Sequence, residues 1–231
     1  MNKRDKICTN VPRNISKAII SQEIISRIRQ LGGKTDHVKG TSLREDILSI
    51  TFDTVLYQRP VDTPWAKAED MEPIYGIGQF FDDNKNLFEK DEQAFYDKLI
   101  DKYYRLTEEG YGQMFWTAQL FTPFKEGTED FDEWNDMFVD NEDIDLSEVI
   151  ELTHDRRPDF IQVFYNYGFP DHYYICLSDP NPENPTLFGT DHEVFFSEIT
   201  NEGTLEDFLS TFMTKKELIE IIKGQVENEK F

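Results

Sequence analysis

The sequence predicts an α+β fold in a single domain, and three observations support this prediction. Segments with a helical period and short segments rich in aromatic and β-branched residues both occur along the chain. The length of 231 residues suits one mixed domain, so we expect residues 1–231 to form one unit. Hydrophobic residues make up 38% of the chain and include 19 Phe and 10 Tyr, which is enough to build a core without disulfide or metal staples.

The first predicted element is a helix over residues 14–31. Apolar residues recur there at the helical period, Asn14 is a candidate N-cap, and Gly32 with Gly33 ends the pattern. Residues 46–58 alternate between apolar and polar side chains and are followed by a proline, which predicts a half-buried strand.

The middle of the chain is predicted as a loop, a short apolar run, a helix and a strand. Residues 60–73 are rich in proline and acids and form the loop. The apolar run 74–81 ends at the polar cluster 82–86, which is typical of a turn. Residues 92–107 place apolar side chains on one helical face, and residues 114–122 have the composition of a strand.

Two strands and a connecting turn are predicted in the next part of the chain. Residues 160–165 and 173–177 are the strands, and residues 167–171 form the turn between them. Two further short strands are expected at residues 187–188 and 194–196.

Two helices are predicted to close the chain. Thr204 with Asp207 and Thr214 with Glu217 have the spacing of capping boxes, in which two side chains satisfy the free N–H groups at a helix start.

Composition excludes several partner classes. The chain carries 46 acidic and 24 basic residues, which gives a net charge of −22. Because phosphate backbones are bound by Lys and Arg, we expect neither nucleic acid nor an anionic membrane surface among its partners. A field of this sign attracts cationic partners; the alternative is that the charge serves solubility alone.

The cysteines and the N-terminus indicate a cytoplasmic protein. Cys8 and Cys176 form no motif and are too few for a secreted disulfide framework. The first residues lead into no apolar segment typical of a signal peptide, and no run of about 18 apolar residues predicts a membrane span.

Residues 126–151 form the most acidic stretch. They contain 12 acids and no Lys or Arg, and we expect a long loop or an exposed short helix on the surface. Aromatic side chains are interleaved with the acids, so the stretch combines steering charge with apolar anchors for a basic partner. The alternative is that these aromatic side chains fold back on the core. The candidate partner-binding residues are Asp130, Asp132, Glu133, Trp134, Asp136, Asp140, Glu142 and Asp143.

All four histidines have an aspartate as a sequence neighbour: His37, His154, His172 and His192. Such a pair can orient an imidazole for catalysis or metal binding. Acids are so abundant here that adjacency arises by chance, and no known metal-ligand spacing is present. We therefore predict no catalytic residue, no metal and no cofactor. A hydrolase that uses a pair of carboxylates stays open, because 46 acids offer many pairs.

The C-terminal part resembles the SUKH superfamily. In that family a strand with an Asp-His dipeptide precedes a helix that begins Ser/Thr-Leu/Phe-x-Glu/Asp-Phe-Leu. The matching stretches, within residues 160–222, are 173–180, 184–193 and 204–209. Residues 60–150 have no counterpart in this pattern.

The resemblance implies a largely antiparallel sheet with flanking helices and a non-enzymatic role. Many bacterial members are immunity proteins that bind and neutralise a toxin, often a nuclease. A nuclease is cationic because it must hold nucleic acid, and an inhibitor with a charge of −22 complements it. We therefore expect a basic cognate toxin as the partner. The first alternative is a regulatory scaffold of the same fold that binds a cellular protein. The sequence leaves the oligomeric state open.

Overall fold

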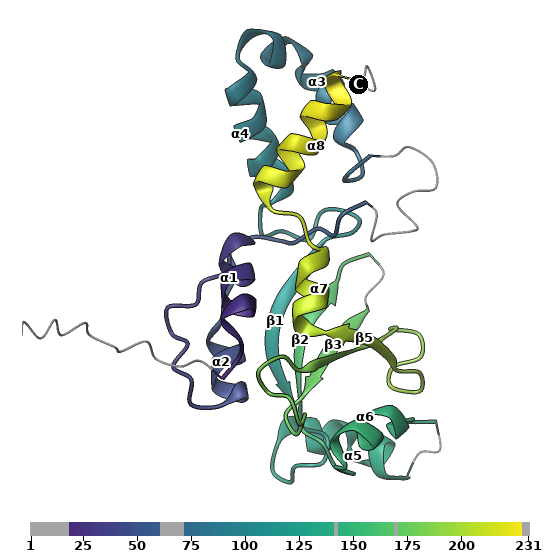
Figure 1. Ribbon diagram of the computed structural model, residues 1–231. Helices are drawn as coiled ribbons and strands as arrows, with labels where there is room; N and C mark the ends of the chain where they lie inside the picture. The colour runs from purple at the N-terminus through teal and green to yellow at the C-terminus, as the bar shows by residue number, and fades with distance from the viewer. Residues whose placement is uncertain (1–18, 61–71, 141–142, 169–170, 228–231) are drawn as a thin grey trace, which may run out of the picture.

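A five-stranded antiparallel sheet forms the centre of the molecule (Figure 1). The computed structural model describes residues 19–60, 72–140, 143–168 and 171–227. Neighbouring strands in the sheet are also neighbours in the chain: β1 (Met114–Phe121), β2 (Phe160–Asn166), β3 (His172–Cys176), β4 (Thr186–Thr190) and β5 (Thr200–Thr204). The predicted α+β fold with a largely antiparallel sheet and flanking helices is confirmed.

Helices surround this sheet on several sides. In Figure 1, α1 and α2 lie beside β1, and α7 crosses in front of the sheet. The helices α5 and α6 lie at one end, while α3, α4 and α8 form a group at the other. The helices of the described residues are α1 (Gln22–Gln30), α2 (Leu43–Ser49), α3 (Ile77–Lys90), α4 (Glu92–Tyr103), α5 (Glu129–Asp140), α6 (Ser147–Thr153), α7 (Leu205–Thr211) and α8 (Lys215–Glu227). None of these helices is both long and apolar enough to cross a membrane.

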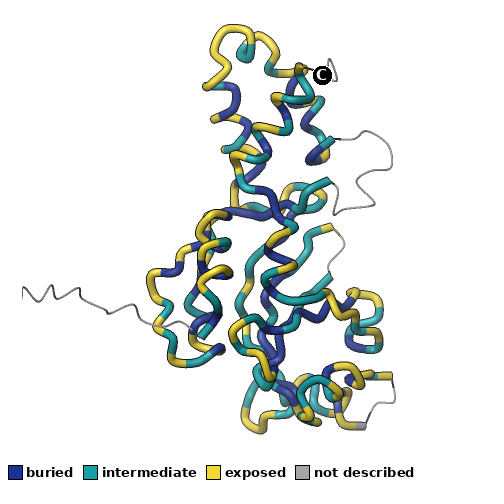
Figure 2. Tube along the Cα trace, viewed as in Figure 1, coloured by how far each residue is buried: buried dark blue, intermediate teal, exposed yellow. Residues whose placement is uncertain are grey.

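One face of the sheet is covered by α1, α2 and α7. Ile161 and Ile175 of the sheet lie in one core cluster with Ile24 and Ile28 of α1 and Leu209 of α7. Successive strand residues point to opposite faces, so Phe160 and Tyr174 contribute to a different cluster on the other face. In Figure 2 buried residues are concentrated along the central strands.

The helices α3, α4 and α8 enclose a separate aromatic core. Phe80 and Phe81 of α3 lie 5.4 and 5.5 Å from the ring of Phe95 in α4, measured between ring centroids. Leu218 and Ile222 of α8 are buried in the same cluster. Packing of this kind stabilises helices whose intrinsic propensity is modest.

Most of the predicted elements are confirmed. Strand 114–122 matches β1, 160–165 matches β2 and 173–177 matches β3, with the ends shifted by a residue or two. Helix 92–107 is present as α4 but ends earlier, at Tyr103.

Both predicted helix caps near the C-terminus are also present. Thr204 and Asp207 form a capping box at the start of α7. The Thr214 N–H donates to Glu217 Oε2 at 2.7 Å, and the Glu217 N–H donates to Thr214 Oγ1 at 3.1 Å, just before α8.

The first predicted helix begins later than expected. The helix α1 begins after Ser21, whose hydroxyl accepts the Ile24 N–H at 3.1 Å, and it ends before Gly32, which has a φ of 97°. Asn14, the predicted cap, and most of loop 60–73 lie outside the described residues.

The predicted strand 46–58 is wrong. Residues 43–49 form α2, and residues 51–58 make only isolated bridges to four separate partners. Asp46, fully buried, holds α2 by accepting the backbone N–H groups of Ile19 and Gly40, each at 2.8 Å. These hydrogen bonds connect segments that are distant in sequence. The alternation of apolar and polar residues within 46–58 therefore contained no sign of them.

Two further predictions need correction. The polar cluster 82–86 is not a turn but the middle of α3, because the aromatic core holds that helix through it. Residues 194–196 form a turn rather than a strand, and the sheet takes β5 from 200–204 instead. For the acidic stretch the helical alternative is confirmed rather than the loop, since it contains α5 and α6. Phe138 within it is buried, as the alternative that its aromatic side chains fold back on the core had it.

Candidate functional site

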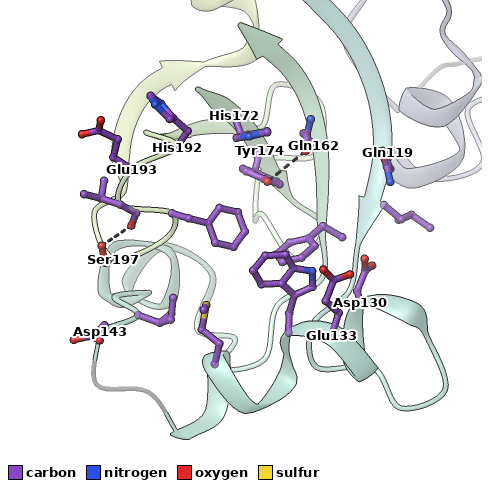
Figure 3. A pocket seen from close by; sticks show the side chains of 17 residues that line it. Gln119, Asp130, Glu133, Asp143, Gln162, His172, Tyr174, His192, Glu193 and Ser197 are labelled. Carbon is purple, nitrogen blue, oxygen red and sulfur yellow. Dashed lines mark hydrogen bonds between the residues drawn. The ribbon is translucent and has the colours of Figure 1, made fainter. Parts of the chain in front are cut away.

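A cleft of about 660 Å³ opens between α5, one face of the sheet and the turn at residues 192–197 (Figure 3). Its side chains come from β1, β2, β3, α5 and two turns that are distant in sequence. The strand register explains the floor of the cleft. Gln119, Gln162 and Tyr174 are cross-strand neighbours, and their side chains lie on one face.

Hydrogen bonds hold the polar floor in place. The Tyr174 hydroxyl donates to Gln162 Oε1 at 3.4 Å, and Gln162 Nε2 donates to Thr117 Oγ1 at 3.5 Å. Burial, followed by the nearby Asp130 carboxylate, raises the pKa of Tyr174, so its hydroxyl stays neutral. The floor therefore presents uncharged polar groups.

Aromatic rings form one wall of the cleft. The Trp134 ring of α5 lies 4.9 Å from the Phe195 ring, and it lies 6.3 Å from Phe121 of β1. Phe121 is buried, whereas Trp134 and Phe195 are half-buried and contribute accessible ring surface. Such rings contribute apolar area at low entropy cost when a partner covers them.

Four carboxylates surround these rings. Asp130, Glu133, Asp143 and Glu193 line the cleft, and among its described lining residues there is no Lys or Arg. Figure 3 shows Asp130 and Glu133 together on the right of the cleft, with Glu193 and Asp143 on the left. The cleft is therefore a negatively charged site with an apolar wall.

Asp130 has a structural role within this set. Its Oδ2 accepts the Thr122 backbone N–H at 2.8 Å and the Thr122 hydroxyl at 3.1 Å. The Thr128 hydroxyl accepts the Phe131 N–H at 3.2 Å, which caps the start of α5. These bonds fix α5 against the end of β1 and thereby set the width of the cleft.

The turn opposite α5 is held by its own hydrogen bonds. Asp191 Oδ1 accepts the Glu193 N–H at 2.7 Å, which starts the turn. Phe196 has a φ of 54°, a left-handed conformation that is unfavourable for a side chain of its size. Thr190 Oγ1 accepts the Phe196 N–H at 2.9 Å, and the Phe196 carbonyl accepts the Asp145 N–H at 2.9 Å. These constraints place Phe195 against Trp134.

Two histidines lie at the upper side of the cleft as drawn in Figure 3. The His172 ring lies 5.4 Å from the Tyr165 ring and 6.4 Å from the Tyr174 ring. Burial, and then the charge of His192, lowers the pKa of His172. His172 is thus held neutral near physiological pH.

The predicted partner-binding residues divide into three groups. Asp130, Glu133, Trp134 and Asp143 lie together in the cleft. Asp132 and Asp136 are exposed on α5 outside the lining of the cleft. Asp140 ends α5, and Glu142 lies outside the described residues.

Sequence reasoning missed the other side of the cleft. Glu193, Phe195, His172 and Tyr174 join the site through the register of β3 with β4 and through the turn that follows β4. The Asp-His pairs at 171–172 and 191–192 were the available signal, but nothing in the sequence showed that they are adjacent in space.

Comparisons with protein-family profiles, with curated proteins and with solved structures give no match.

Proposed function

We propose that the protein is a non-enzymatic immunity protein that neutralises a basic toxin, of nuclease type, in the cytoplasm. The cleft between α5 and the turn at 192–197 receives a basic side chain of the toxin. The observation that carries this proposal is the combination of four carboxylates and two accessible aromatic rings in one cleft.

The chemistry of the cleft favours arginine as the residue that enters it. A guanidinium group stacks on aromatic faces and donates two parallel N–H groups to one carboxylate. The ammonium group of lysine is a compact point charge and lacks this planar geometry. Trp134 and Phe195 supply the faces, and Glu133, Asp143 and Glu193 supply the carboxylates. An aromatic–cation contact at a partly desolvated site contributes about 1–2 kcal/mol.

The charge of the whole chain supports the same partner class. A net charge of −22 steers a cationic protein towards the molecule and accelerates association. The resemblance to the SUKH immunity proteins is consistent with this role and belongs to the proposal. A regulatory scaffold of the same fold would instead hold a basic cellular protein in the same cleft.

The test is co-expression with a toxin domain encoded next to this gene. Cells that express the toxin should survive with the intact chain. They should lose protection with the triple variant Glu133→Gln, Asp143→Asn and Glu193→Gln. The matched control neutralises three exposed acids on α3 and α4, namely Asp82, Glu89 and Asp97, and should retain protection.

Kinetics of the purified pair distinguish the cleft from the general field. We expect the cleft variant to associate about tenfold more slowly and to show a weaker salt dependence, because three of the charges nearest the partner are removed. Trp134→Ala should instead accelerate dissociation, because it removes apolar contact rather than charge. If the cleft and control variants behave alike, the acids of the cleft serve solubility and the proposed interface is wrong.

A further inference from the structure

The pairing of β3 with β4 brings two aspartates face to face. His172 pairs with Thr190 in this antiparallel register. Asp171 directly precedes β3, and Asp191 directly follows β4. The two aspartates therefore lie opposite each other, one position beyond the end of the ladder. Like charges at such a position destabilise a sheet.

His192 completes a three-residue cluster at this position. Its Nδ1 lies 3.3 Å from Asp191 Oδ1 and 3.9 Å from Asp171 Oδ1. One donor atom from each of the three residues lies within 4.8 Å of the other two. Three ligand atoms at about 2.0–2.2 Å from a tetrahedral ion are separated by about 3.3–3.6 Å, so small side-chain rotations suffice to place them around one ion.

Within the described part of the chain, His192 is the basic side chain that lies against these carboxylates. Asp171 Oδ1 is buried, and it has no hydrogen-bond partner among the described residues. The ion pairs of the described segments join neither Asp171 nor Asp191 to a Lys or Arg. A buried acceptor atom without a partner is unfavourable, and a bound cation relieves this cost.

We propose that Asp171, Asp191 and His192 form a binding site for one divalent transition-metal cation of the Zn²⁺ class. This proposal departs from the prediction that no histidine binds a metal. One imidazole nitrogen with two carboxylate oxygens suits Zn²⁺, Co²⁺ or Mn²⁺, whereas Mg²⁺ and Ca²⁺ prefer oxygen ligands alone. Three protein ligands leave a position for water or for a group of a partner.

A hydrogen bond outside the ligand set supports this assignment. The Glu193 N–H donates to Asp191 Oδ1 at 2.7 Å and so orients the carboxylate towards His192. The side chains of Asp191 and His192 are 55% and 36% exposed, so an ion can enter without opening the fold.

The test measures Zn²⁺ and Co²⁺ binding to the metal-free, untagged full chain by calorimetry and by the visible spectrum of Co²⁺. We expect one ion per chain at micromolar or lower concentration, with millimolar Mg²⁺ failing to displace it. His192→Gln and Asp191→Asn should each weaken binding at least about 100-fold. Loss of an outer-shell partner already weakens metal binding by about 10- to 100-fold, and these substitutions remove a direct ligand. The double variant Asp36→Asn, His37→Gln changes an exposed Asp-His pair elsewhere and should bind as the unmodified chain does.

Two results would overturn the proposal. The first is the absence of Zn²⁺ and Co²⁺ binding up to millimolar concentration. The second is binding that His192→Gln and Asp191→Asn leave unchanged, since the ion would then lie elsewhere. The exposed positions of His192 and Asp191 make unfolding by either variant unexpected, and an unchanged melting temperature verifies this.

Discussion

Asp130 is bonded to Thr122 through a single carboxylate oxygen, which accepts both the backbone N–H at 2.8 Å and the hydroxyl at 3.1 Å. Thr122 follows β1, and Asp130 lies in the first turn of α5. The most acidic helix is therefore attached to the sheet by one of its own acids. Charge in this helix has two roles, since Asp130 fixes the helix while Glu133 faces the cleft.

This relationship predicts a stability difference between two neighbouring acids. Asp130→Ala should lower the free energy of unfolding by about 1–3 kcal/mol, because the Thr122 N–H and hydroxyl lose their acceptor. Asp132→Ala, at an exposed position of the same helix, should change it by less than about 0.5 kcal/mol. Urea unfolding of the two variants measures both values, and equal destabilisation would contradict the assignment.

The turn that carries Phe195 should depend on Thr190. Thr190 is 3% exposed, and its hydroxyl accepts the N–H of Phe196, the residue with a left-handed backbone. Thr190→Val keeps the shape but leaves a buried N–H without an acceptor, which should cost about 1–3 kcal/mol. The measurement is thermal unfolding of Thr190→Val beside the control Thr200→Val, which changes an exposed residue of β5. Equal melting temperatures for the two variants would show that the turn does not need this bond.

The N-terminal helices should depend on one buried carboxylate. Asp46 Oδ1 accepts the N–H groups of Gly40 and Lys39, at 2.8 and 3.2 Å, and Oδ2 accepts that of Ile19 at 2.8 Å. Asp46→Asn turns an acceptor into a donor that faces these groups, and should lower the free energy of unfolding by about 1.5–3 kcal/mol. Asp36→Asn, at an exposed position, is the control in chemical denaturation. A neutral effect of Asp46→Asn would mean that these bonds contribute little.

His172 should make the fold sensitive to mild acid. Burial, and then the charge of His192, depresses its folded-state pKa, so the unfolded chain takes up the proton first as the pH falls. The contribution of neutral His172 to the free energy of unfolding is fully present above the unfolded-state pKa of about 6.5. It is lost as the pH falls through the lower folded-state pKa. His172→Phe should flatten the dependence of stability on pH below about 6.5. A profile that His172→Phe leaves intact would contradict this account.

Asp171 should destabilise the metal-free protein at neutral pH. Burial, followed by repulsion from Asp191, raises its pKa, so the folded state holds the proton more tightly than the unfolded state. The proton is lost as the pH rises, and stability falls with it. Asp171→Asn should therefore raise the melting temperature at pH 7 in the presence of a chelator. Asp171→Asn should also abolish any increase in melting temperature that Zn²⁺ causes. If Asp171→Asn lowers the melting temperature in chelator, repulsion between Asp171 and Asp191 does not destabilise the metal-free protein.

The sequence determined the elements whose signals are local. The caps at Thr204 and Thr214 and the strands β1, β2 and β3 follow from residues within a few positions of one another. It also placed Asp130, Glu133, Trp134 and Asp143 in one acidic stretch, because a run of charge is visible in the chain itself.

Only the tertiary structure decided the rest. The helix α2 depends on bonds from Asp46 to backbone up to 27 residues away, and α3 continues through its polar cluster because Phe95 of another helix packs against it. Asp171 and Asp191 are 20 positions apart in sequence and meet only through the register of β3 and β4. Long-range register and packing are set by the burial of whole faces, and no local stretch of sequence contains that information.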